Sequence, residues 1–172
     1  MKIVVLMHNI RSTYNVGAIL RTCDGFGVDT AVFSGITPRF DDERLLPHLR
    51  EKLNKQIHKT ALGAEKMVKI ENVENIKDKI FELKNDGYKI IGLENNIENK
   101  TYLLDSEEMQ RILKENEDGK ITVLLGEEVD GINKELFPVI DYFVEIPMSG
   151  EKESFNVSVA TGVILWELRR KR

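Results

Sequence analysis

Two nearly continuous apolar segments close to the C-terminus constrain the fold more than any other feature of the chain. They read ITVLL (121–125) and YFVEI (142–146). Strands that are apolar along their whole length belong to a sheet covered on both faces, because every side chain then needs an apolar partner. The two segments therefore predict an α/β protein built around a sheet with helices on either side.

Each of these segments runs directly into a loop of residues that favour turns. Gly126 and Gly131 follow the first segment, and Pro147, Ser149 and Gly150 follow the second. In an open α/β sheet, ligands bind outside the carboxyl ends of the strands, so these loops form a candidate ligand site. Each residue also has a simpler interpretation, because a glycine after a strand often only forms a turn and a proline can merely end the strand.

The rest of the chain alternates between strand and helix patterns. Apolar runs predict strands at residues 2–8, 29–35, 67–70 and 88–94. Apolar residues at helical spacing predict helices at residues 16–25, at 72–86 and from the Asp105 cap to about Asn116. This alternation predicts an α/β fold with a mostly parallel sheet and helices on both faces, and the length fits a single domain, residues 1–172.

The first predicted helix carries a polar feature as well as an apolar face. Asn15 has the residue type and position of an N-cap, and the apolar face runs from Val16 to Cys23. Gly17 and Arg21 lie one turn apart on another face. A glycine beneath an arginine leaves room for a ligand to approach, but it equally permits close packing of a second helix.

Residues 35–63 are predicted to form a long irregular stretch. Long loops in compact domains are usually functional or disordered. This one is rich in basic side chains, among them Arg39 and Lys59, but acidic residues interleave with them. It is therefore either a surface for an anionic partner or a solvated loop of mixed charge.

Charge and cysteine content narrow the classes of function. A formal net charge of −4 argues against a general nucleic-acid binder, because such binding depends on neutralising phosphates, so any basic surface must be local. The single cysteine, Cys23, excludes an internal disulfide and fits a reducing compartment, so we expect a cytoplasmic protein. No apolar run approaches the length of a membrane span, and the histidines and the cysteine have no metal-ligand spacing, so neither a membrane nor a metal is expected.

Several common site signatures are absent from the sequence. No G-x-G-x-x-G follows the first strand and no acidic residue stands about twenty positions beyond it, which disfavours a dinucleotide-binding dehydrogenase. The phosphate-binding pattern G-x-x-x-x-G-K-[ST] and the nucleophile pattern G-x-S-x-G do not occur either.

The predicted C-terminal helix, residues 157–170, is apolar around nearly its whole circumference. A helix of that kind must be buried on both sides. One side can pack on the sheet, whereas the other needs a partner, and a second copy of the chain is the simplest one. The sequence therefore predicts a homodimer formed through the C-terminal helix.

Three motifs in order give the chain a family resemblance. They are NVGAILRT (15–22), the pair LLGEEVDG (124–131) and VEIPM (144–148), and SFNVSVA (154–160). Together they resemble the SpoU/TrmH branch of the SPOUT RNA methyltransferases, and the resemblance spans essentially the whole chain. It implies a SPOUT fold in which the cofactor-binding part, about residues 88–172, forms a C-terminal trefoil knot, and it implies a homodimer.

The resemblance also implies an enzymatic activity. S-adenosylmethionine would donate a methyl group to a ribose 2′-hydroxyl of RNA, with tRNA favoured over rRNA as the substrate. A catalytically inactive RNA-binding module of the same fold is the alternative. The 2′-hydroxyl is the group that distinguishes RNA from DNA at a site.

The resemblance assigns candidate site residues to three roles. Those for cofactor binding are Leu93, Glu94, Leu125, Gly126, Ile146, Pro147, Met148, Ser154 and Asn156. Those for catalysis are Arg21, Asn15, Asn156, Ser154 and Glu128. Those for RNA binding are Arg11, Arg21, Arg39 and Lys59.

Arg21 matches the catalytic arginine of the family, and two roles for it stay open. It could activate the hydroxyl, or it could hold the adjacent phosphate and stabilise negative charge that develops on the oxygen. The second role agrees better with a guanidinium that stays protonated in proteins. Asn15 would orient the helix that carries Arg21, Glu128 would brace its loop or the facing subunit, and Asn156 would be an N-cap, a cofactor ligand or both.

Overall fold

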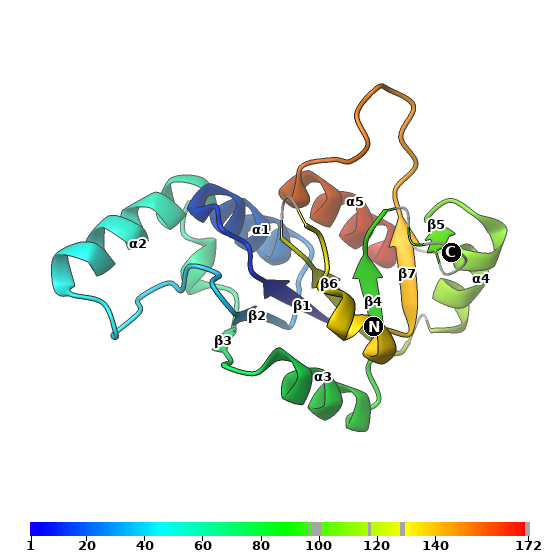
Figure 1. The fold of residues 1–172 in the computed structure, drawn as a ribbon, viewed down its shortest axis with the longest axis horizontal. Helices are drawn as coiled ribbons and strands as arrows, with labels where there is room; N and C mark the ends of the chain where they lie inside the picture. The colour runs from blue at the N-terminus through cyan, green and yellow to red at the C-terminus, as the bar shows by residue number, and fades with distance from the viewer. Residues whose placement is uncertain (96, 98–100, 117, 128–129, 171–172) are drawn as a thin grey trace.

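The computed structural model of the protein describes residues 1–95, 97, 101–116, 118–127 and 130–170. Within this part of the chain seven strands form one sheet in the order β3-β2-β1-β6-β4-β7-β5, and each neighbouring pair is parallel. The parallel sheet predicted from the apolar runs is therefore confirmed (Figure 1). The strands are β1 (Lys2–His8), β2 (Thr30–Ser34), β3 (Ile70–Asn72), β4 (Lys89–Leu93), β5 (Thr101–Leu103), β6 (Lys120–Leu125) and β7 (Tyr142–Glu145).

Helices cover both faces of this sheet, as predicted. The side chains of β1 alternate between the faces, with Val5 in one apolar cluster and Leu6 in the other. The first cluster contains residues of α1 (Thr13–Gly25), α2 (Pro47–Ala61), α4 (Glu107–Glu115) and α5 (Val157–Arg169). The second contains residues of α3 (Ile76–Asn85) and of the short 3-10 helix η2 (Lys134–Val139); a further 3-10 turn, η1, spans Ala64–Lys66. Figure 1 shows α1 and α5 above the sheet and α3 below it.

The prediction of an irregular stretch at residues 35–63 is wrong, because α2 lies within it. Its apolar residues, from Leu53 through Ile57 to Ala61, recur every four positions and form only a narrow stripe, which the surrounding charges obscure. Pro47 occupies the first turn, where its fixed φ is favourable. Leu62 ends the helix in the left-handed conformation, with φ 52°.

The start of α1 also differs from the prediction. Ser12, not Asn15, is its N-cap, since the Ser12 hydroxyl accepts a hydrogen bond from the Asn15 backbone amide at 3.3 Å. Asn15 therefore lies in the first turn, and its side-chain oxygen accepts a hydrogen bond from Asn156. Helices α3 and α4 also begin slightly later than predicted, because their N-caps are Asn75 and Ser106.

Candidate functional site

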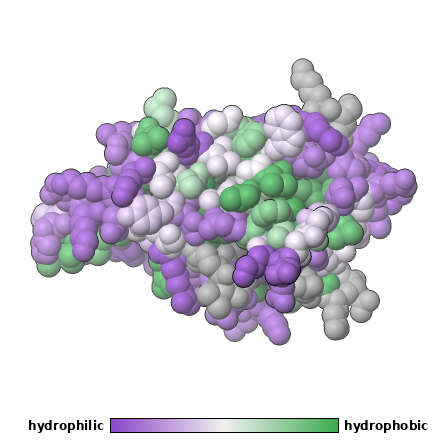
Figure 2. Space-filling view, turned by 90° about the horizontal axis from the view of Figure 1, so that it is seen from above, coloured by the Kyte–Doolittle hydropathy of each residue, from purple (hydrophilic) through white to green (hydrophobic). Residues whose placement is uncertain are grey.

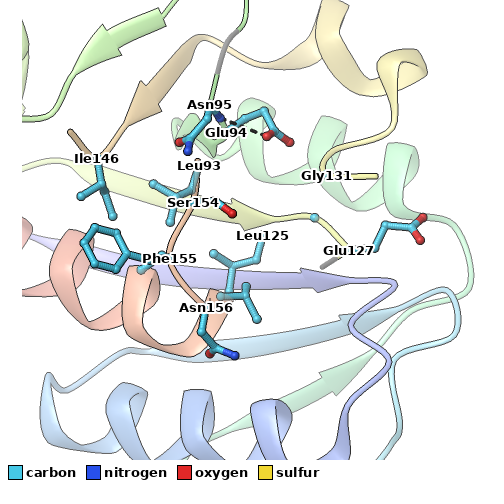
Figure 3. A pocket seen from close by; sticks show the side chains of 13 residues that line it. Leu93, Glu94, Asn95, Leu125, Glu127, Gly131, Ile146, Ser154, Phe155 and Asn156 are labelled. Carbon is cyan, nitrogen blue, oxygen red and sulfur yellow. Dashed lines mark hydrogen bonds between the residues drawn. The ribbon is translucent and has the colours of Figure 1, made fainter. Parts of the chain in front are cut away.

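A pocket of about 350 Å³ opens at the carboxyl ends of three adjacent strands, β6, β4 and β7, beside the start of α5 (Figure 3). This is the place where the topology of an α/β sheet favours a ligand. The volume lies in the range of small-molecule sites. The lining residues are Leu93, Glu94, Asn95, Leu125, Gly126, Glu127, Gly131, Ile146, Ser154, Phe155, Asn156, Val157 and Ala160.

The turn after β6 is closed tightly upon itself. The backbone amide of Glu127 donates to the Gly131 carbonyl at 3.1 Å, and the Gly131 amide donates back to Glu127 at the same distance. A Cβ on Gly126 would lie 2.3 Å from the carbonyl carbon of Gly131, closer than side chains approach a backbone. Only glycine at position 126 permits this turn, which forms one wall of the pocket.

Glu94 connects the turn after β4 to the turn after β6. One of its carboxylate oxygens accepts from the Ile132 amide at 2.6 Å, and the other accepts from the Asn95 amide at 3.0 Å. The Asn95 side chain in turn donates to the Glu153 carbonyl at 2.6 Å, so the loop before α5 is held as well. These hydrogen bonds join the turns after β4 and β6 to the loop before α5.

Asn156 has two structural roles at the pocket. Its side-chain oxygen accepts from the Ser158 backbone amide at 2.9 Å, which makes it the N-cap of α5. Its side-chain nitrogen donates to the Asn15 side-chain oxygen at 3.2 Å. This hydrogen bond joins the start of α1 to the pocket and brings two predicted site residues together.

The structure places most of the predicted cofactor residues in this pocket. Leu93, Glu94, Leu125, Gly126, Ile146, Ser154 and Asn156 line it, whereas Pro147 lines a neighbouring hollow beside α4 and Met148 lines neither. Glu128 lies outside the described residues. Gly131 lies in the loop that the sequence predicted for a ligand, and Glu127 belongs to the same motif but was given no role. Phe155 belongs to the third motif but was given no role, and Asn95 carried no signal, because an amide in a loop has many explanations.

Arg21 is exposed and does not line the pocket of its own chain. Gly17, one turn before it, packs against α2, where a Cβ would lie 2.2 Å from the Thr60 hydroxyl and 2.3 Å from the Ile57 carbonyl oxygen. Of the two interpretations of this glycine, close packing of a second helix is therefore the one the structure supports. Arg21 continues the same row of α1 beyond the helix contact.

The other predicted RNA-binding residues have different surroundings. Arg11, with 60% of its side chain exposed, pairs with Glu127 at 2.8 Å beside the pocket. Arg39 has only 9% of its side chain exposed and pairs with Glu74 at 2.8 Å, so it does not fit a surface that meets RNA. Lys59 is exposed, and its ammonium lies 5.6 Å from the centre of the Tyr14 ring.

Two titratable groups near the core have altered pKa values. Burial lowers the pKa of His8, and the negative charge of Glu127 opposes this only in part. Burial raises the pKa of the Cys23 thiol to about 12, so this thiol is an inert part of the core.

Among the described residues no group of three or more potential ligands could hold a metal ion. No helix in that part of the chain is both long and apolar enough to cross a membrane.

The sequence of the chain is similar to those of known RNA methyltransferases. The chain is 32% identical over 170 residues to a tRNA (guanosine(18)-2'-O)-methyltransferase of Aquifex aeolicus, covering 99% of this chain and 70% of that protein. It is 33% identical over 170 residues to the 23S rRNA (guanosine-2'-O-)-methyltransferase RlmB of Xylella fastidiosa, covering 99% of this chain and 59% of the relative. The chain thus spans only part of the length of these relatives.

Solved structures share the fold. The crystal structure of the A. aeolicus TrmH/SpoU tRNA modifying enzyme superposes with a TM-score of 0.74 at 26% identity, covering 98% of this chain and 74% of that one. An AdoMet-bound rRNA methyltransferase from Sinorhizobium meliloti superposes with a TM-score of 0.77 at 20% identity, covering 98% and 56%. The model of the SpoU rRNA Methylase family matches residues 2–166, nearly the whole sequence. The chain belongs to the SpoU methylase family.

Proposed function

We propose that this protein transfers a methyl group from S-adenosylmethionine to a ribose 2′-hydroxyl of RNA. The observation that carries the proposal is the pocket at three joined strand-exit turns in a member of the SpoU methylase family. Relatives named as tRNA and 23S rRNA 2′-O-methyltransferases support the same reaction. We favour tRNA as the substrate, with rRNA as the second choice.

The pocket fits S-adenosylmethionine chemically. Leu93, Leu125 and Ile146 give it apolar walls for an adenine ring, and the open backbone of the turns offers hydrogen bonds. The cofactor carries a net positive charge at neutral pH, which the carboxylate of Glu94 complements. When bound, it supplies a methyl group activated on a sulfonium.

The chain's own residues would contribute positioning and electrostatics. Asn156 and Ser154 line the pocket at the start of α5, and Asn15 fixes Asn156 by a hydrogen bond. Arg21, which is exposed, acts on the RNA: its guanidinium grips a phosphate and stabilises the target oxygen as that oxygen loses its proton. We assign Glu128 to bracing its loop and Arg11 to contact with RNA at the mouth of the pocket.

We also propose the larger organisation that the resemblance implies. Residues 1–172 form one methyltransferase domain, and about residues 88–172 form a trefoil knot. Membership of the SpoU methylase family supports the knot. A single buried thiol and an RNA substrate support a cytoplasmic location.

A homodimer through α5 is part of this proposal. The inner side of α5 is buried at Ile164 and Leu165, while its outer side leaves Val159 50% exposed and Trp166 61% exposed. Figure 2 shows hydrophobic atoms gathered over the region where α5 lies. Exposed apolar patches of this kind mark interaction sites. A second copy of the same helix covers them symmetrically.

Replacing Trp166 with glutamate should dissociate this dimer. A central tryptophan typically contributes at least about 2 kcal/mol to an interface, so we expect the dimer to weaken by about 30-fold or more. Light scattering after gel filtration measures the mass directly. Phe81→Glu is the matched control, because Phe81 is 52% exposed on α3, on the other face of the sheet. A dimer that survives Trp166→Glu unchanged would place the interface elsewhere.

The alternative function is an inactive RNA-binding module, which the absence of Arg21 from the pocket lining would allow. One experiment distinguishes an active enzyme from such a module. The purified protein is titrated with S-adenosylmethionine by calorimetry and then incubated with total RNA and tritiated cofactor. We expect binding and transfer of label to RNA from a strain that lacks the gene. Binding of RNA without binding of the cofactor would support the module instead. Mapping of ribose methylation in that strain identifies the RNA.

A further inference from the structure

Helix α2 packs on the body of the protein through its middle and C-terminal turns, from Leu53 onward. Its buried residues are Ile57 and Ala61, both in its C-terminal half, which packs against α1. Residues 47–56 include no buried side chain, and Figure 1 shows this part of α2 standing away from the sheet at one end of the molecule. Burial of apolar surface does not explain why this half of α2 stands away from the sheet. Contact with a binding partner would explain it.

The basic side chains of α2 differ in whether they already have an acidic partner. Arg50 pairs with Asp41 at 3.6 Å, His58 pairs with Glu65 at 2.7 Å, and Lys55 pairs with Glu51 at 2.7 Å. Lys52 and Lys59 form no ion pair with any carboxylate in the part of the chain that the structure describes. These two ammonium groups are exposed and remain able to meet an external anion.

The two unpaired lysines belong to one face of the helix. His48, Lys52 and Lys59 are separated by four and seven positions, which places them in one row. The same three side chains line a shallow groove with Gln56 and with Tyr14 of α1. Glu51 also reaches this groove, but Lys55 neutralises it. The groove is therefore basic on balance in a protein whose formal net charge is −4.

The groove leads toward the cofactor pocket. Lys59 lies 5.6 Å from the centre of the Tyr14 ring, and the Tyr14 carbonyl accepts a hydrogen bond from Thr60 at 2.9 Å. The next residue, Asn15, accepts the hydrogen bond from Asn156 that joins α1 to the pocket. Successive contacts from Lys59 through Tyr14 to Asn15 thus connect the groove to the pocket.

We propose that this groove of α2 binds the phosphate backbone of the RNA substrate on one side of the methylated nucleotide, with Lys52 and Lys59 as phosphate contacts. The inference rests on the proposed function and extends it to a defined surface. An extended strand suits the groove because ammonium groups track phosphates, while the Tyr14 ring, 46% exposed, offers a stacking surface for a base. The Arg39 side of the same segment takes no part, because the Arg39 side chain is buried as well as paired with Glu74.

The test is the double variant Lys52→Gln/Lys59→Gln in the full-length chain. Each lost phosphate contact should reduce the slope of log K against log salt concentration by about 0.7 to 0.9. We expect binding of the RNA substrate to weaken by about 10- to 50-fold near physiological salt, with the KM for RNA rising equally. The kcat and the affinity for S-adenosylmethionine should stay at wild-type values.

The control variant is Lys89→Gln/Lys114→Gln, which removes the same charge from exposed lysines away from the groove. It should bind RNA within about twofold of wild type, since bulk charge alone has a small effect. If both double variants bind RNA equally well, or lose affinity equally, the groove is not the contact surface. If the wild-type protein neither binds nor methylates RNA, the proposed function itself fails, which is a distinct result.

Discussion

Arg21→Ala should lower kcat for RNA methylation by about 10²- to 10³-fold, the usual effect of removing one group that stabilises a developing oxyanion. Binding of S-adenosylmethionine should not change, because Arg21 does not line the pocket. The fold should also be unaffected, since the side chain is exposed. Single-turnover methylation at saturating RNA, together with calorimetry of the cofactor, measures the two effects separately.

A second substitution distinguishes the roles of this arginine. Arg21→Lys keeps the positive charge but loses the planar pair of donors that matches a phosphate. If Arg21 acts as a phosphate clamp, the lysine variant should recover part of the lost rate and show a higher KM for RNA. Arg111→Ala is the control, because Arg111 is an exposed arginine on α4. Turnover like that of wild type in Arg21→Ala would exclude any catalytic role.

The strands and the place of the pocket could be predicted from the sequence for a simple reason. Nearly continuous apolar runs such as residues 121–125 are typical of buried parallel strands, and the glycines that follow this run lie at the carboxyl edge of the sheet. The pocket indeed lies there. Local apolar patterns were sufficient to predict the strands, because each residue of a sheet covered on both faces must be buried.

Features that depend on long-range contacts could not be predicted in this way. Arg39 and Lys59 look alike in the sequence, yet one is buried against Glu74 and the other is exposed beside Tyr14. Only the position of the loop before α3 and of α1 around them decides which charge is already satisfied. The helix α2 was missed because a stripe of one apolar residue per turn is weaker than the charge pattern around it.

The structure also shows that position 126 has no room for a side chain, which no sequence pattern reveals. Its φ is not positive, so alanine is compatible with the backbone conformation. The obstacle is contact alone, since the added carbon would lie 2.3 Å from the Gly131 carbonyl carbon and 2.5 Å from the Ile132 amide nitrogen. These are backbone atoms of the opposite arm of the turn, and they cannot rotate away as a side chain can.

Gly126→Ala should therefore open the turn and weaken binding of S-adenosylmethionine by about 100-fold or more, equivalent to about 2.7 kcal/mol. Isothermal calorimetry measures this loss, and thermal unfolding shows whether the variant is folded. Gly150→Ala is the matched control, because a Cβ there meets nothing within 4 Å, and it should bind the cofactor as wild type does. A folded Gly126→Ala protein with wild-type affinity would show that the turn after β6 is not a wall of the cofactor site. If the Gly126→Ala protein loses the cofactor but still binds RNA, the methyl donor binds at this turn and the RNA binds on a separate surface.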